Sequence, residues 1–122
     1  MAITIMIDRQ SGTIVGDDNV RNRSYTIDEL KTLASNGDKE AQCAMGDYFA
    51  MPEVFNLDKA MEWYSKAAGR GHAKAQFFMG QASFTGIGMP QDFKKAESWL
   101  KKAAEQGYTE AEKALAMYSL VF

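Results

Sequence analysis

The strongest constraint on the fold is a twelve-residue segment that occurs twice, at 60–71 (AMEWYSKAAGRG) and thirty-six residues later at 96–107 (AESWLKKAAEQG). The copies share six identical positions, which pair Ala60 with Ala96, Trp63 with Trp99, Lys66 with Lys102, Ala67 with Ala103, Ala68 with Ala104 and Gly71 with Gly107. A period in the mid-thirties is typical of stacked helix pairs, because one pair cannot bury its own apolar face and must pack against its neighbours. The repeat therefore predicts an all-α fold, a short α/α superhelix or solenoid of helix pairs.

The composition bounds the class of protein. The chain has 122 residues, of which 46% are hydrophobic and 25% are charged, as expected of one folded domain rather than of a disordered segment. Fourteen basic and sixteen acidic side chains leave a formal net charge of −2. Because the chain has no basic excess, we expect neither nucleic acid nor an anionic membrane as a partner.

The cysteine count and the hydropathy of the chain restrict the possible cofactors and the expected cellular compartment. Cys43 is the single cysteine, which excludes an intramolecular disulfide and a thiol-rich metal site. The first ten residues (MAITIMIDRQ) lack the basic start of a secretion signal, and their apolar stretch is interrupted at Asp8. No segment approaches the ~18 consecutive apolar residues that a transmembrane helix requires. We expect a cytoplasmic protein that uses no metal or other cofactor.

The N-terminal segment follows a different pattern from the rest of the chain. Within residues 2–7, isoleucine occupies every second position, which is the period of a β-strand. A turn at 9–12 and a return strand at 13–15 complete a predicted β-hairpin, and 16–23 is predicted to be a polar linker. The expected domains are thus 1–23, the N-terminal β-hairpin and linker, and 24–122, the helical repeat domain. A lone hairpin is marginally stable, so it should pack on the helices or pair with another chain.

Six helices are predicted from their start and stop signals, at 26–37, 38–50, 56–71, 73–84, 92–107 and from 109 onward. Thr26 and Glu29 form a capping box, and Asn56 and Asp92 are good N-caps. Gly46 and Gly80 occupy the same position in two of the helices. Glycine inside a helix costs about 1 kcal/mol relative to alanine, so we expect these glycines to let a neighbouring helix approach closely.

These repeated motifs resemble a known family. The series Ala75-Gln76, Met79-Gly80, Gly86-Ile87-Gly88, Asp92, Ala96-x-x-Trp99 and Lys102-Ala-Ala-x-x-Gly107 is similar to one full unit of the Sel-one-like repeat, a relative of the tetratricopeptide repeat. Residues 41–71 resemble a second unit, two residues shorter and without the glycine pair. The resemblance covers about 26–119 and leaves the hairpin outside. It implies an α/α superhelix that acts as an adaptor, scaffold or signalling-complex component without catalysis of its own.

The residues that could in principle bind a ligand or catalyse a reaction are predicted to have structural roles. Trp63 and Trp99 lie on the apolar stripe of the repeated helix, which predicts core packing. The segment 86–88 (GIG) follows a helix and lacks the lysine of a P-loop, so it predicts a tight interhelical turn. His72 is expected to make a packing or loop contact, and Cys43 to be a small buried apolar residue. Since no catalytic motif is present, we expect the protein not to be an enzyme.

Surface recognition is the function that remains. In helical arrays the first helix of each pair usually lines the concave side, so the residues beside the apolar stripe of these helices are the candidate partner-binding set. They are Gln42, Asp47, Phe77, Gln81 and Lys113. Phe77 is the strongest candidate of the five, because it lies beside the buried stripe and an aromatic side chain there can anchor a partner. The alternative is that Phe77 packs between neighbouring units.

Three functional hypotheses follow. The leading one is a non-enzymatic adaptor or scaffold that binds a peptide or protein on its repeat surface. The second is an immunity protein that neutralises a bacterial toxin, which the short chain, mild acidity and added hairpin suggest. The third is a self-assembling structural module that forms a homodimer through its chain ends or its hairpin, since arrays need about three repeats to be stable alone.

Overall fold

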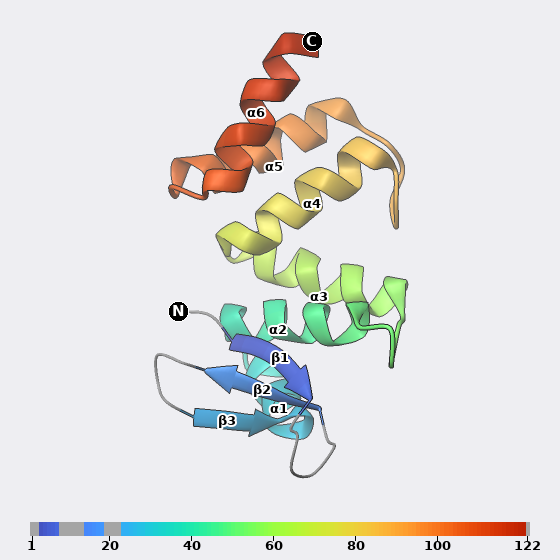
Figure 1. The fold of residues 1–122 in the computed structure, drawn as a ribbon, viewed down its shortest axis with the longest axis vertical. Helices are drawn as coiled ribbons and strands as arrows, with labels where there is room; N and C mark the ends of the chain where they lie inside the picture. Colours follow the sequence, from blue (N-terminus) through green and yellow to red (C-terminus); the bar gives the residue numbers. More distant parts are fainter. Residues whose placement is uncertain (1–2, 8–13, 19–22, 122) are drawn as a thin grey trace. The chain divides into compact units, whose positions relative to one another are not determined.

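The computed structural model describes residues 3–7, 14–18 and 23–121. In chain order its elements are β1 (Ile3–Ile7), β2 (Ile14–Asp18), β3 (Arg23–Thr26), α1 (Ile27–Ser35), α2 (Lys39–Ala50), α3 (Leu57–Gly69), α4 (Ala73–Thr85), α5 (Phe93–Glu105) and α6 (Thr109–Val121) (Figure 1). The predicted helical repeat fold is confirmed, with the helix starts close to their expected positions. The chain forms two compact units, Met1–Trp63 and Tyr64–Phe122, whose boundary lies within α3.

The N-terminal strands form a three-stranded antiparallel sheet in the order β1-β2-β3. Along β1, Ile3 pairs with Asp18 and Ile7 with Ile14, which confirms the predicted hairpin. The third strand was not predicted, and it pairs Val15 with Thr26.

The predicted linker at 16–23 is therefore wrong at both of its ends. Its first three residues belong to β2, and Arg23 begins β3. The linker prediction failed because β3 (RSYT) has four residues and a single large apolar side chain, Tyr25, which is too short a pattern to identify a strand without its pairing with β2. β3 also crosses the expected domain boundary between 23 and 24. The predicted turn at 9–12 and the linker residues 19–22 lie outside the described residues.

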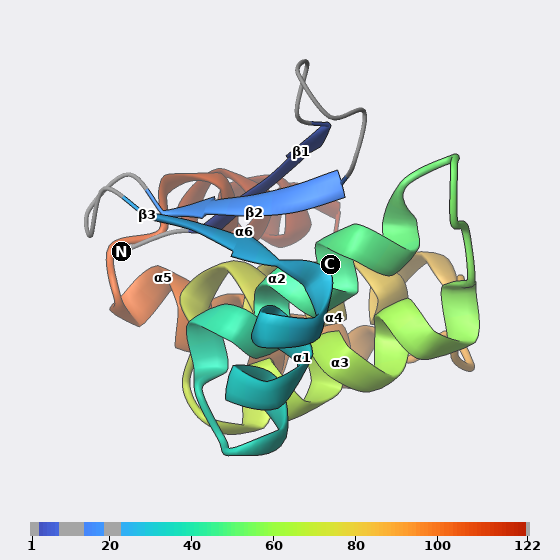
Figure 2. The same ribbon diagram turned by 90° about the horizontal axis from the view of Figure 1, so that it is seen from below.

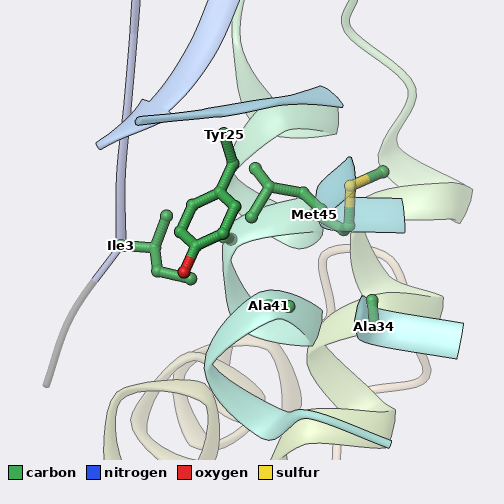
Figure 3. Packing of buried hydrophobic residues seen from close by; sticks show 7 residues of the cluster. Ile3, Tyr25, Ala34, Ala41 and Met45 are labelled. Atoms are coloured by element: carbon green, nitrogen blue, oxygen red, sulfur yellow. The ribbon is translucent and has the colours of Figure 1, made fainter. Parts of the chain in front are cut away.

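The sheet packs on α1 and α2, as Figure 2 shows from below. The buried residues of their common core are Ile3, Tyr25, Leu30, Ala34, Ala41, Ala44 and Met45 (Figure 3). Gly16 of β2 faces this core, and a Cβ added to it would lie 2.4 Å from Leu30 Cδ1 and 3.0 Å from Ile3 Cγ2. The glycine therefore lets the fully buried Leu30 pack against the sheet backbone.

Local hydrogen bonds fix the starts of the helices at the predicted residues. The capping box is present, because Thr26 Oγ1 accepts from Glu29 N at 3.1 Å and Thr26 N donates to Glu29 Oε1 at 3.3 Å. Asn56 accepts from the backbone of Lys59 at 3.1 Å, and Asp92 from that of Lys95 at 3.0 Å. Such caps each contribute about 1 kcal/mol.

In the C-terminal unit, α4 and α5 pack closely around Gly80. A Cβ at this position would lie 2.9 Å from Leu100 Cγ and 3.3 Å from the Ala96 carbonyl oxygen. The prediction that this glycine allows a close helix approach is confirmed. None of the helices in the described part of the chain is long and apolar enough to cross a membrane.

The two tryptophans are less deeply packed than the sequence predicted. Trp63 is partly buried at the side of the N-terminal core, and Trp99 is also partly buried, with Lys102 Nζ 4.7 Å from its ring centroid. The Lys102 ammonium group therefore lies within cation–π distance of the Trp99 ring.

We predict that Gly16→Ala destabilises the protein by about 1–3 kcal/mol, because the added methyl overlaps Leu30 in a packed core. Gly69→Ala is the control, since a Cβ there meets nothing within 4 Å. It should be neutral or slightly stabilising. Urea denaturation measures both changes, and equal midpoints for the two variants would contradict the packing role of Gly16.

Candidate protein-interaction surface

Gln42, the first predicted contact residue, is 4% exposed. Its Nε2 donates to the carbonyl oxygen of Ala34, eight residues earlier, at 3.0 Å. Its Oε1 has no hydrogen-bond partner among the described residues. The buried amide thus closes the turn between α1 and α2.

The same hydrogen bond recurs in the next repeat. Gln76 Nε2 donates to the carbonyl oxygen of Ala68, again eight residues earlier, at 3.2 Å. Gln106 Nε2 donates to Gln76 Oε1 at 2.9 Å and to the Gly71 carbonyl oxygen at 2.8 Å. The sequence signal for this bond is the Ala-Gln pair at 41–42 and 75–76, which marks a structural position.

Phe77 is also buried, at 9% exposure. It packs with Leu100, Ala103 and Ala111, and its ring centroid lies 5.3 Å from that of Tyr108 in an edge-to-face arrangement. The alternative that Phe77 packs between helices of neighbouring repeats is confirmed. Residues of α5 and α6 cover its ring.

The other three predicted contact residues remain accessible to different degrees. Asp47 on α2 is half-buried, whereas Gln81 on α4 and Lys113 on α6 are exposed. The structure does not test whether any of the three binds a partner, and they stay predictions.

An exposed apolar surface that the sequence analysis missed lies where α4 ends and α5 begins. We define it as the α4–α5 patch, made of Gln81, Phe84, Ile87 and Phe93. The rings of Phe84 and Phe93 touch, with centroids 5.2 Å apart, and both remain exposed at their outer sides. Phe93 begins α5 and packs on the ring of Phe84 at the surface.

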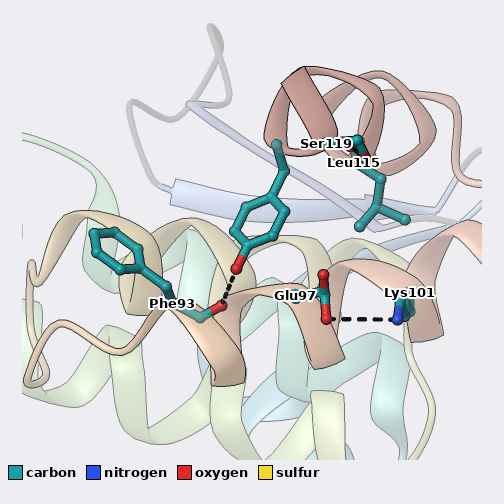
Figure 4. Close-up of polar contacts among 6 residues, drawn as sticks. Phe93, Glu97, Lys101, Leu115 and Ser119 are labelled. Carbon is teal, nitrogen blue, oxygen red and sulfur yellow. Dashed lines mark hydrogen bonds and ion pairs between the residues drawn. The ribbon is translucent and has the colours of Figure 1, made fainter. Parts of the chain in front are cut away.

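Neighbouring contacts hold this patch in place. The Tyr118 hydroxyl on α6 donates to the Phe93 carbonyl oxygen at 3.2 Å (Figure 4). Gln91 Nε2 donates to the Phe84 carbonyl oxygen at 2.9 Å, and Asp92 N donates to that of Ser83 at 2.7 Å. The loop between α4 and α5 is thus tied to the end of α4, which keeps the patch ordered before any partner binds.

Ile87 occupies the tip of that loop and is 60% exposed. Gly86 and Gly88 on either side have φ angles of 76° and 77°, in the left-handed region that favours glycine. The expected tight interhelical turn is confirmed, and its geometry presents an apolar side chain to solvent. Sequence reasoning used the two glycines and overlooked the residue between them.

His72 and Cys43 occupy structural positions. His72 Nδ1 accepts from Ala75 N at 3.2 Å and caps α4, which confirms the predicted loop contact. Cys43 is buried, as expected. Among the residues that the structure describes, no group of three or more His, Cys, Asp or Glu side chains is placed to hold a metal ion.

Comparison with known families identifies the repeat. The family described as Sel1 repeat matches residues 39–72 and again residues 73–108. An uncharacterized Sel1-like repeat-containing protein of Schizosaccharomyces pombe is 34% identical over 75 residues, which are 62% of this chain and 11% of that protein.

Two solved structures share both fold and sequence with the chain. The protective antigen c5321 of uropathogenic Escherichia coli, which displays an SLR fold, has a TM-score of 0.69 and 35% identity over 75% of this chain. A Sel1 repeat protein from Oxalobacter formigenes has a TM-score of 0.69 and 40% identity over 73%. The chain spans only 20% and 26% of these two proteins, so it matches a fraction of their arrays.

We predict that Phe77→Ala lowers the free energy of unfolding by about 3–5 kcal/mol, because it empties a packed aromatic site. The matched control is Gln81→Ala on the same helix, which is exposed and should change stability by less than about 0.5 kcal/mol. Thermal and urea unfolding followed by circular dichroism measure the difference. If the two variants unfold alike, the buried role of Phe77 is wrong.

Proposed function

Because the chain belongs to the Sel1 repeat family, we propose that it is a cytoplasmic, non-enzymatic interaction module that binds a protein or peptide through its α4–α5 patch. Repeats of this type generally mediate protein interactions. The observation that carries the proposal is a group of exposed apolar side chains held on an ordered loop. Such side chains are enriched where proteins bind one another.

The chemistry of the patch suits a partner with apolar anchors. Phe84, Ile87 and Phe93 offer apolar contact area, and Gln81, one turn before Phe84, offers an amide that both donates and accepts. An apolar centre with a polar margin is the usual arrangement of a protein interface. Asp47 and Lys113 are proposed as contacts outside the patch, while Gln42 and Phe77 support the helices from within.

The burial of Cys43 and the capping role of His72 support a function without catalysis, since both groups are engaged in structure. The adaptor and immunity hypotheses use the same kind of surface and differ in the partner. An adaptor binds short segments weakly and repeatedly, whereas an immunity protein binds one toxin tightly. The size and affinity of the partner therefore separate them.

We predict that Ile87→Glu weakens partner binding at least about tenfold, because it replaces an exposed apolar side chain of the patch by a charged one. Phe55→Glu is the matched control, since Phe55 is 62% exposed but lies in the N-terminal unit. Partners are captured from source-cell lysate on the wild type, identified, and titrated by calorimetry against both variants.

Both variants should keep the wild-type unfolding midpoint, because each change is at an exposed site. If only Phe55→Glu loses binding, the partner binds the N-terminal unit and not the α4–α5 patch. Equal binding by all three proteins would remove the α4–α5 patch from the proposal.

A further inference from the structure

The outer edge of β1 has no strand partner in the described part of the N-terminal sheet. β1 pairs with β2 on one side, and no described strand pairs with its other side. Natural edge strands are usually protected by a lysine, a proline or a bulge, because an open edge attracts other strands. β1 (ITIMI) has no charge and no proline, and its five residues pair with β2 without a bulge.

The opposite edge of the same sheet is formed by β3, which differs from β1 in composition. β3 begins with Arg23 and continues directly into α1. At its end, Thr26 N already donates to Glu29 Oε1. β1, by contrast, carries no charged side chain.

The sequence of β1 is complementary to itself when reversed about Ile5. In an antiparallel pair centred on this residue, Ile5 lies opposite Ile5, Thr4 opposite Met6, and Ile3 opposite Ile7. Residues opposite one another lie on the same face of a sheet. The pairing thus matches apolar with apolar residues on the face of Ile3 and Ile5, which pack on the core.

On the other face, Thr4 and Met6 are exposed, with Met6 at 44%. In the proposed pair, Thr4 of one copy lies opposite Met6 of the other, and neither side chain is charged. A chain with a net charge of −2 repels its copy overall, yet this strand brings no like charges together. The pairing itself therefore adds no charge repulsion to the association of two copies.

We propose that β1 pairs in antiparallel fashion with β1 of a second copy, across a two-fold axis at Ile5. The two three-stranded sheets then form one continuous sheet of six strands. Figure 2 shows β1 as the strand of the sheet that lies farthest from α1, so its outer edge points away from that helix. The pairing is independent of the α4–α5 patch, which lies in the other compact unit.

The test is sedimentation velocity of the full chain over a range of concentrations. The wild type should show a reversible monomer–dimer equilibrium. Thr4→Lys with Met6→Lys places a lysine opposite a lysine twice in the dimer, and should raise the dissociation constant at least about tenfold. Thr4→Lys with Met6→Glu places a lysine opposite a glutamate twice, and should restore a dissociation constant near that of the wild type.

Both double variants change exposed positions, so their circular dichroism spectra and unfolding midpoints should match those of the wild type. A wild type that is monomeric at every concentration overturns the proposal. If the double-lysine variant dimerises with the wild-type dissociation constant, the contact lies elsewhere, for example at the chain ends, and the proposal is overturned as well. Failure of the Lys–Glu variant to restore the dimer rejects the register. Ile87→Glu should dimerise like the wild type, which keeps this outcome separate from partner binding.

Discussion

A helical repeat leaves an apolar face open wherever the array begins, and the N-terminal half of this structure depends on how that face is covered. Leu30 of α1 is fully buried between the helices and the sheet, against the backbone of Gly16. Ile3 and Tyr25 fill the rest of the same face. The sheet thus takes the place of a preceding helix pair, which explains how a segment outside the repeat pattern stabilises the repeats.

α6 differs from α4 at two positions that pack inside the array. α6 carries Lys113 where α4 has the buried Phe77, and Ala116 where α4 has Gly80. A helix that approached α6 as closely as α5 approaches α4 would meet the Ala116 methyl group, because Leu100 and Ala96 already contact the Gly80 position. The outward face of α6 therefore differs in kind from the faces that stack inside the array.

The sequence predicted the positions of the helices better than it predicted which side chains are exposed. Gln42 and Phe77 show the reason. The capping bonds that start helices join residues three apart, so Thr26, Asn56 and Asp92 were identifiable from sequence alone. Exposure depends on neighbours that are distant in the chain. All residues at 41–46 are buried, because α2 packs on more than one side, and a single apolar stripe does not describe such a helix.

The same reasoning accounts for the two elements that the sequence did not reveal. β3 is four residues long, and its pairing with β2 and the burial of Tyr25 both depend on residues distant in the chain. The α4–α5 patch exists because Phe93 begins a helix and meets Phe84 at the surface, which only the packing of α5 on α4 determines. Local chemistry, by contrast, did predict the turn that carries Ile87, since the left-handed conformation at 86 and 88 requires glycine.

The β1 edge and the α4–α5 patch are separate contacts, and this separation affects the affinity for partners with more than one binding segment. The β1 edge belongs to one compact unit and the α4–α5 patch to the other, so neither contact needs residues of the other. A dimer through β1 would carry two patches, and a partner with two binding segments would then bind its second segment within the same complex. The effective concentration of that second step, in the millimolar range for short flexible linkers, would turn weak individual contacts into stable assembly. Dimerisation would therefore raise affinity for repeated or dimeric partners while leaving affinity for a single segment unchanged.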